Sequence, residues 1–247
     1  MKKLTYIITI MIFVTANLAA QSFPSGEDIL RRVDANIGSD NKISTAEMII
    51  HGKRGSRSMK SKSWMMGEEK SFTEYLAPAR EKGTKMLKLK DQLWIYIPST
   101  DRTIKISGHM MRQSVMGSDL SYEDMMEDTQ LLNNYEANVI GEEILLDRAC
   151  WVLELTSKVE ETAYHSRKIW VDKERYISLR EDRFARSGKL LKTFEAGDVK
   201  RIQNRWIPTH MVFKDVLKGG KGTEFILESI EFNAVIPEHV FTKASLR

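Results

Sequence analysis

Five carboxylates stand close together near the middle of the chain, and they are the first residues whose spacing could support chemistry. They are Asp119, Glu123, Asp124, Glu127 and Asp128. A metal site or an acid–base pair would need several of these groups to converge on one point. On a helix, Asp119 and Glu123 form one row four residues apart, and Asp124 and Asp128 form a second, so the groups need not converge. The segment also lacks the D-x-D-x-D-G spacing of a calcium loop.

Helix capping explains these acids without a metal. Ser121 lies three residues before Asp124, and Ser118 stands directly before Asp119, as expected at helix N-termini. Acidic side chains in a first turn also interact favourably with the helix dipole. We therefore predict a short helix near residue 120 whose carboxylates act as caps and face solvent.

Other residue types that carry chemistry are scattered along the chain. The histidines are His51, His109, His165, His210 and His239. They form no H-x-x-x-H pair and have no cysteine beside them, so the sequence predicts no zinc site. No serine stands in a G-x-S-x-G elbow, and Lys218–Thr223 has the wrong order for a phosphate-binding loop. Cys150 lies in an apolar alternation and is expected to be a small buried filler. We expect neither an enzyme nor a bound metal or cofactor.

The N-terminus differs from the rest of the chain. Met1-Lys2-Lys3 is basic, residues 4–18 are apolar and Ala19-Ala20 are small. This pattern predicts a cleaved secretory signal peptide over residues 1–20, with an uncleaved anchor as the alternative. The chain of 247 residues has a formal net charge of +4, and the two signal lysines supply half of it. The rest is nearly neutral, which argues against a nucleic-acid partner.

Beyond the signal, the hydrophobic pattern predicts a mainly β protein. Ser25–Ile37 is expected to form an amphipathic helix with Ser25 as its N-cap and an apolar stripe that ends at Ile37. Period-two alternation then predicts successive strands separated by turn residues. These strands are expected at 43–51, 57–66, 70–76, 84–89, 93–97, 102–106, 135–144, 150–158, 163–171, 176–185, 189–200, 206–217 and 223–232. We expect one domain, 21–247, built on a curled antiparallel meander with helices over its concave face.

Large apolar side chains concentrate in the central segment from Asp91 to Asp128. Five of the chain's 13 methionines lie there, and the β-prone run Leu93–Ile97 is apolar on both faces. Such a strand is either buried on both sides or lines a cavity with one of them. Unbranched methionine adapts to surfaces of different shape, which suits contact with an acyl chain. The candidate cavity and lid residues are Trp64, Met66, Trp94, Tyr96, Met110, Met111, Met116, Tyr122 and Met125.

Three stretches resemble one known family. Leu93–Pro98, Asp101-Arg102 and the run from Ser114 to Met125 together resemble the bacterial outer-membrane lipoprotein-sorting proteins, which are similar in fold to the periplasmic lipoprotein carrier LolA. The residues of the family motif are Gly117, Ser118, Asp119, Glu123 and Asp124. The resemblance implies an incomplete, half-open antiparallel β-barrel of roughly eleven strands, with a few short helices covering the concave face and a hydrophobic cavity.

The resemblance also implies a function. We expect a periplasmic carrier that binds acyl chains of lipoproteins or lipids and moves them toward the outer membrane. Its partners would be an inner-membrane transporter and an outer-membrane acceptor, with transient membrane contact. Residues 108–127 would form a lid hinged at Gly108 and Gly117. The alternative is a non-catalytic periplasmic accessory protein of an inner-membrane exporter or envelope-assembly complex, which would use the same surface to dock a protein.

Overall fold

The structure is a computed structural model and describes residues 23–38, 41–52, 55–127, 130–160 and 162–247. The predicted signal peptide and Asp128 lie outside the described residues. In the described part of the chain, no helix is both long enough and apolar enough to cross a membrane.

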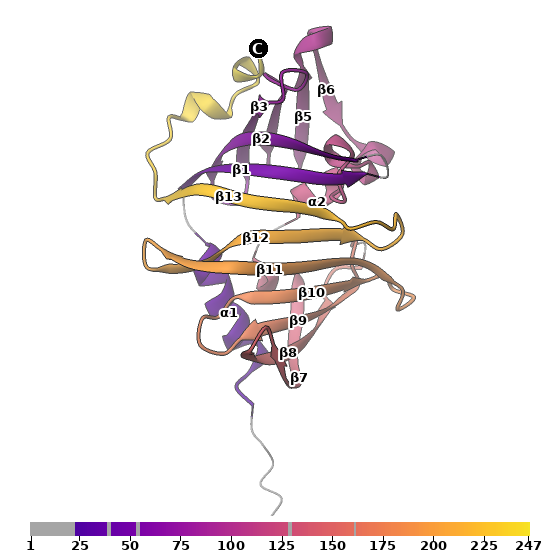
Figure 1. Cartoon of the computed structure of the whole chain (residues 1–247), viewed down its shortest axis with the longest axis vertical. Coiled ribbons are helices and arrows are strands. Elements are labelled where there is room, and N and C mark those ends of the chain that lie inside the picture. The colour runs from indigo at the N-terminus through magenta and orange to yellow at the C-terminus, as the bar shows by residue number, and fades with distance from the viewer. Residues whose placement is uncertain (1–22, 39–40, 53–54, 128–129, 161) are drawn as a thin grey trace, which may run out of the picture.

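One antiparallel sheet of 13 strands makes up most of the fold (Figure 1). The strands are β1 (Asn41–Gly52), β2 (Gly55–Met66), β3 (Lys70–Ala77), β4 (Lys85–Leu89), β5 (Gln92–Ile97), β6 (Arg102–Ile106), β7 (Tyr135–Leu145), β8 (Arg148–Ser157), β9 (Ser166–Asp172), β10 (Ser178–Phe184), β11 (Leu190–Ile202), β12 (Arg205–Asp215) and β13 (Thr223–Phe232). Each of the thirteen predicted segments overlaps one of them. The resemblance implied roughly eleven strands, so the sheet is larger than that expectation.

The order of the strands shows how the chain builds this sheet. It runs β6-β5-β4-β3-β2-β1-β13-β12-β11-β10-β9-β8-β7. The chain therefore starts at the centre with β1 and adds strands in sequence out to the edge strand β6. It then crosses to the opposite edge at β7 and adds strands back toward the centre, where β13 pairs with β1. Figure 1 shows β5 and β6 running across the direction of β1 and β13, so the sheet curls strongly. Its two edges do not pair, which confirms a half-open barrel.

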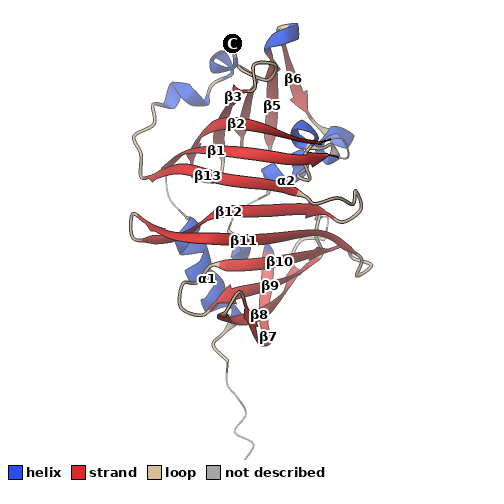
Figure 2. Ribbon diagram, viewed as in Figure 1, coloured by secondary structure: helices blue, strands red, loops and turns tan. Residues whose placement is uncertain are grey.

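The helices are short and few (Figure 2). They are α1 (Gly26–Ile37), α2 (Tyr122–Met126) and α3 (Leu131–Asn134), with the 3-10 turns η1 (Pro98–Thr100), η2 (Gly108–Arg112), η3 (Val115–Gly117), η4 (Glu238–Phe241) and η5 (Lys243–Leu246). Ser25 caps α1 as predicted, because its hydroxyl accepts a hydrogen bond from the Asp28 N–H at 3.0 Å. The buried stripe of α1 ends at Val33, while Ile37 is exposed.

Strand register shows which helices share a face. Across the sheet, Met48 of β1 lies opposite Phe225 of β13, which lies opposite Met211 of β12, and directly opposed residues point to the same side. Met211 lies opposite Ala196 of β11, which shares its side of the sheet with Phe194, and the register leads from Phe194 through Glu181 to Ile169 of β9. Ile169 packs in the cluster under α1, and Met48 packs in the cluster under η2, η3 and α2. Both coverings therefore lie on one side, which we call the inner face.

The outer face is covered differently in its two halves. The segment after β13 folds back over β3 and β4, and its residues Ile236, Phe241 and Leu246 are buried against them. The segment contains the turn η4, and Pro237 is its N-cap. On the other half, Cys150 and Trp170 belong to a separate buried cluster. Cys150 is the small buried filler that the alternation predicted.

The seating of α1 on the inner face yields a stability prediction. A Cβ added at Gly26 would lie 2.3 Å from the carbonyl oxygen of Ala137 in β7, so the helix must shift. Alanine favours a helix by about 1 kcal/mol over glycine, but overpacking against rigid backbone costs about 1–3 kcal/mol. We expect Gly26→Ala to destabilise the protein, measured by urea denaturation.

A matched substitution on the same strand separates this clash from a general effect of alanine. Gly141 of β7 has open space around its Cβ position and no positive φ. Gly141→Ala should leave the free energy of unfolding unchanged or slightly raised. Equal stability of the two variants would contradict the close approach of α1 to β7.

Candidate functional site

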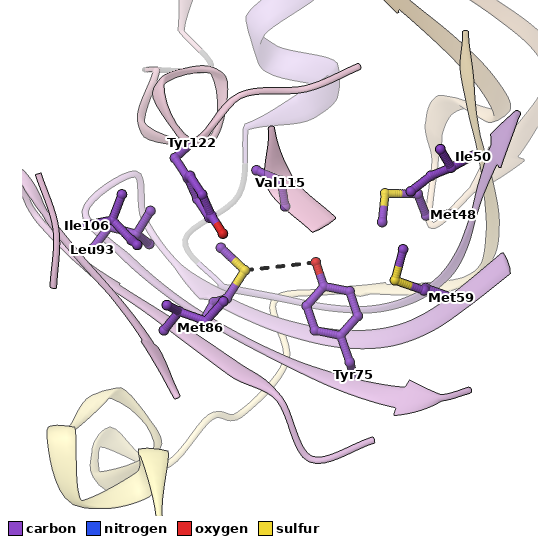
Figure 3. Close-up of a cluster of buried hydrophobic side chains, with 10 residues drawn as sticks. Met48, Ile50, Met59, Tyr75, Met86, Leu93, Ile106, Val115 and Tyr122 are labelled. Carbon is purple, nitrogen blue, oxygen red and sulfur yellow. Dashed lines mark hydrogen bonds between the residues drawn. The ribbon is translucent and has the colours of Figure 1, made fainter. Parts of the chain in front are cut away.

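The connection from β6 to β7 crosses the inner face and carries most of the predicted site. We call residues 107–127 the crossover segment. Two of its side chains, Val115 and Tyr122, are buried against Met48, Met59 and Met86 of the sheet (Figure 3). The predicted residues Met110, Met111, Met116 and Met125 are partly buried and pack against the same cluster. The structure therefore brings these four methionines and Tyr122 together on the inner face.

The other four predicted residues lie on the opposite side of the sheet. Trp64, Met66, Trp94 and Tyr96 pack with Phe72 in the outer-face cluster beneath the C-terminal segment. In β5, successive side chains alternate between faces, so Leu93, Ile95 and Ile97 point to the inner side. The strand is buried on both sides, and the predicted wall and lid do not share one cavity.

Trp64 borders a small groove on that outer face. The groove has a volume of about 260 Å³ and runs between β3 and the C-terminal segment. Its lining residues are Trp64, Phe72, Glu74, Lys85, His239, Val240 and Ser245. A larger, polar cleft of about 620 Å³ lies between α1, α3, the turn after β2, the start of β12 and the residue after β13. It contains none of the predicted residues.

The motif residues fasten the crossover segment to the ends of β12 and β13. Asp119 is buried, and its carboxylate accepts hydrogen bonds from the Thr223 hydroxyl at 2.6 Å and the Asp215 N–H at 3.0 Å. The Lys218 ammonium donates to the Ser118 carbonyl at 2.6 Å. Ser118 itself is fully buried. Asp119 therefore anchors a loop.

Gly117 and Met116 form a strained turn beside β2. Met116 has φ 51° and Gly117 has φ 75°, a region that a side chain disfavours. The Arg57 guanidinium donates to the Met116 carbonyl at 2.5 Å, and an added Cβ at Gly117 would lie 2.5 Å from that guanidinium. Glycine is thus favoured at 117 for its conformation, while the contact with the end of the flexible Arg57 side chain could be relieved by a shift of that side chain.

The predicted cap of α2 is confirmed. The Asp124 N–H donates to the Ser121 hydroxyl at 3.2 Å, and the Ser121 N–H donates to the Asp124 carboxylate at 2.6 Å, which completes a capping box. Glu123 occupies the first turn of α2 and is partly buried.

The expectation that these acids face solvent is wrong for the buried Asp119 and for Asp124. The Asp124 side chain is only 2% exposed, and it pairs with Lys192 of β11 and accepts a hydrogen bond from the Tyr164 hydroxyl. Burial alone would raise its pKa, but the adjacent Lys192 ammonium and the hydrogen bonds from Ser121 and Tyr164 hold the pKa below its ordinary value. Asp124 thus anchors α2 to the wall of the barrel.

Three cations on the inner face pair with carboxylates of the crossover segment. Arg167 of β9, Arg183 of β10 and Lys192 of β11 are directly opposed across neighbouring strands, and we call them the basic row. Glu127 pairs with both Arg167 and Arg183, and the Arg183–Glu127 distance is 3.5 Å. We did not anticipate the basic row, because charged residues in a strand normally indicate a solvated face.

A partly exposed aromatic surface lies beside the basic row. The rings of Phe194 and Phe213 have centroids 4.9 Å apart, and those of Phe213 and Phe225 are 5.4 Å apart. We call these three residues the aromatic strip. It runs over β11, β12 and β13, and its residue Phe225 packs against the cluster beneath the crossover segment.

Two histidines meet on the outer face, where the sequence suggested no grouping. His51 and His210 bind the two carboxylate oxygens of Glu224 at 2.5 and 2.9 Å. Hydrogen bonds from His210 and His51 hold the pKa of Glu224 below its ordinary value. The trio ties β1, β13 and β12 together. Among the described residues, no group of three or more His, Cys, Asp or Glu side chains could hold a metal ion.

A curled sheet with a covered apolar inner face defines a half-open barrel, and known structures share this fold. A domain from Vibrio parahaemolyticus named for outer-membrane lipoprotein sorting has 26% sequence identity and a TM-score of 0.77, over 90% of this chain and 97% of that chain. A DUF1329 family protein from Desulfovibrio piger has 26% identity and a TM-score of 0.82, over 90% and 98%. A LolA superfamily protein from Nitrosomonas europaea has 21% identity and a TM-score of 0.74, over 90% and 100%, and shows a likeness of fold.

Sequence comparison gives the family. Residues 67–247 match the model of a family described only as like an uncharacterized protein. No curated protein matches the chain. The chain belongs to the family of that model, and it has the LolA-like fold of the outer-membrane lipoprotein-sorting proteins. The resemblance noted in the sequence is therefore confirmed.

The ion pair of Asp124 predicts a pH-dependent stability. Asp124→Asn removes a buried charge that Lys192 requires, which costs about 3 kcal/mol at pH 7. Because the folded-state pKa of Asp124 is lowered, its charge stabilises the protein above the ordinary carboxyl range near pH 4. This contribution is lost as the pH falls through the folded-state pKa. Urea denaturation should show a variant deficit that is large at pH 7 and much smaller at pH 3. A constant deficit would contradict the ion pair.

Proposed function

We propose that this protein is a non-catalytic periplasmic carrier that binds acyl chains of lipids or lipoproteins on its inner face and moves them toward the outer membrane. The observation that carries the proposal is the aromatic strip, an apolar surface left partly exposed inside a half-open barrel. Soluble proteins normally bury such side chains, and an exposed apolar patch within a concavity is typical of a ligand site.

The crossover segment is suited to act as the lid of this carrier. Its methionines fill the inner face with unbranched side chains that can repack against cargo. Gly108 and Gly117 both have positive φ, near its first turn and at its tight bend, and would serve as hinges. Burying an acyl chain gains about 0.8 kcal/mol per CH₂, so a lid that competes for the same surface would keep release feasible.

Relatives and the N-terminal pattern support the compartment and the partners. The similar domain from Vibrio parahaemolyticus is named for outer-membrane lipoprotein sorting. A signal peptide over residues 1–20 would export the chain, with 21–247 acting as one carrier domain. The carrier would exchange cargo with an inner-membrane transporter and an outer-membrane acceptor during transient contact with each membrane.

One observation favours the alternative function, an accessory protein of an inner-membrane exporter or envelope-assembly complex. β7 is an edge strand with an unpaired side. Ile140 and Ile144 of β7 and Leu146 of the turn after it are 52%, 74% and 65% exposed. A partner strand could add to this edge through backbone hydrogen bonds. Under this alternative, truncating the three side chains would weaken a protein complex and leave lipid binding unchanged.

The carrier proposal predicts opposite results for two adjacent residues of β12. Phe213 belongs to the aromatic strip, whereas Val212 points to the outer face opposite Glu224. After incubation with vesicles of bacterial phospholipid and repurification, native mass spectrometry should find lipid on the wild type and on Val212→Asp. Phe213→Asp should carry at least about tenfold less lipid, because it places a charge where the chains would lie.

Circular dichroism and thermal denaturation of both variants control for misfolding. Equal lipid occupancy of two folded variants would exclude the aromatic strip as the binding surface. Absence of lipid from the wild type would reject the carrier function altogether.

A further inference from the structure

The basic row is an unfavourable arrangement unless anions neutralise it. Arg183 lies directly opposite Arg167 on one side and directly opposite Lys192 on the other, all on the inner face. Like charges directly opposed across strands repel one another. The side chains of Arg167, Arg183 and Lys192 are 2%, 12% and 14% exposed, so water screens this repulsion poorly.

The sheet itself supplies only part of the neutralising charge. Glu181 of β10 pairs with Arg167 at 3.3 Å and with Arg183 at 3.1 Å. Asp215 lies opposite Lys192 in the register, but its carboxylate accepts from the Leu217 N–H and lies 3.8 Å from Lys218. The strands of the barrel wall therefore provide fewer carboxylates paired with the basic row than the row has cations.

The crossover segment supplies the rest. Asp124 pairs with Lys192 and lies 3.8 Å from Arg183, and Glu127 pairs with Arg167 and Arg183. Each of these two carboxylates thus bridges two neighbouring cations, as the oxygens of a phosphate or carboxylate ligand would. Movement of the crossover segment away from the sheet would remove both.

Arg167 is not fully satisfied even when the crossover segment is in place. Its Nε is buried and has no hydrogen-bond partner among the described residues. Burial, together with the neighbouring Arg183, lowers the pKa of Arg167 to about 9. Its guanidinium also stacks on Tyr135 and Tyr164, with 4.7 and 5.5 Å to the ring centroids. This stacking holds the plane of the guanidinium in place on the inner face.

The basic row adjoins the surface proposed for acyl chains. Lys192 and Phe194 are two residues apart on β11, so their side chains share the inner face. Glu181, beside Arg183, lies directly opposite Phe194. A molecule with an anionic head and apolar chains would contact both surfaces at once.

We propose that Arg167, Arg183 and Lys192 bind the anionic head group of an amphiphile whose chains lie on the aromatic strip, and that Asp124 and Glu127 occupy this head-group site while the crossover segment is closed. The inference rests on the proposed carrier function and adds the class of cargo. Arginine forks suit phosphate and carboxylate groups, which they bind through two parallel hydrogen bonds. Cargo entry would exchange two internal carboxylates for the anion of the ligand.

The test compares two lipids that share dioleoyl chains, anionic phosphatidylglycerol and zwitterionic phosphatidylcholine. Lipid transferred from vesicles to the full chain is measured by mass spectrometry. The wild type should bind phosphatidylglycerol about tenfold more tightly, as expected for a charge-assisted hydrogen bond. Arg183→Gln should abolish this preference without weakening phosphatidylcholine binding.

A second variant distinguishes a competing carboxylate from a structural ion pair. Glu127→Gln removes a group that occupies the site, so phosphatidylglycerol occupancy should rise several-fold while phosphatidylcholine occupancy stays constant. A merely structural role would leave the ratio of the two lipids unchanged. Glu127→Gln also tests the head-group site if Arg183→Gln fails to fold.

Arg180→Gln is the matched control, because Arg180 lies on the outer face of the same strand and pairs with Asp182 at 3.0 Å. It should bind both lipids like the wild type. Equal affinity of the wild type for the two lipids would overturn the head-group site and leave the carrier function standing, whereas binding of neither would reject the carrier function. Glycerol phosphate that binds as tightly as phosphatidylglycerol would indicate a site for free anions and overturn the amphiphile.

Discussion

The pairing of β1 with β13 is the constraint on which the rest of the structure depends. It joins two meanders that the chain builds in succession into one sheet, with β6 and β7 as its far edges. Consecutive strands at opposite edges cannot be joined by a hairpin, so the chain between them must cross one face. That crossing gives the inner face its cover and brings Asp124 and Glu127 against strands far from them in sequence.

The crossover segment therefore contacts the inner face in two ways, one apolar and one polar. The apolar contact, between the methionines and the sheet, can be re-formed by any flexible apolar partner. The polar contacts are directional: Arg57 and Lys218 hold carbonyls of the bend, and the basic row holds two carboxylates. Breaking one buried pair costs about 3–5 kcal/mol, which several methylenes of a bound chain would offset at about 0.8 kcal/mol each. In the proposed carrier, cargo of ordinary length would therefore offset the loss of one such pair.

Local patterns in the sequence predicted the elements well and their mutual placement poorly. Alternation located every strand, and Ser121 with Asp124 located α2, because both signals depend on neighbouring residues. Which apolar face of β5 turns inward depends on the side of the sheet that the crossover segment takes, so Trp94 was wrongly grouped with Met116. The pair of Asp124 with Lys192 spans the crossing in the same way, and no local pattern records it. The ligand role of the grouped residues stays a prediction.

A stable core does not by itself require the basic row. Buried ion pairs can often be replaced by apolar residues of similar volume with no loss of stability. Apolar residues already lie beside the row, at Leu155 of β8 opposite Arg167 and at Phe194 of β11 two residues from Lys192. Three cations in register add repulsion that the sheet only partly neutralises. A hollow that carried chains alone would work better without them, since desolvated charge next to an acyl chain is unfavourable. The row would suit cargo that has a charged end. Once the crossover segment had moved away, the cations on the barrel wall would hold that end in one orientation.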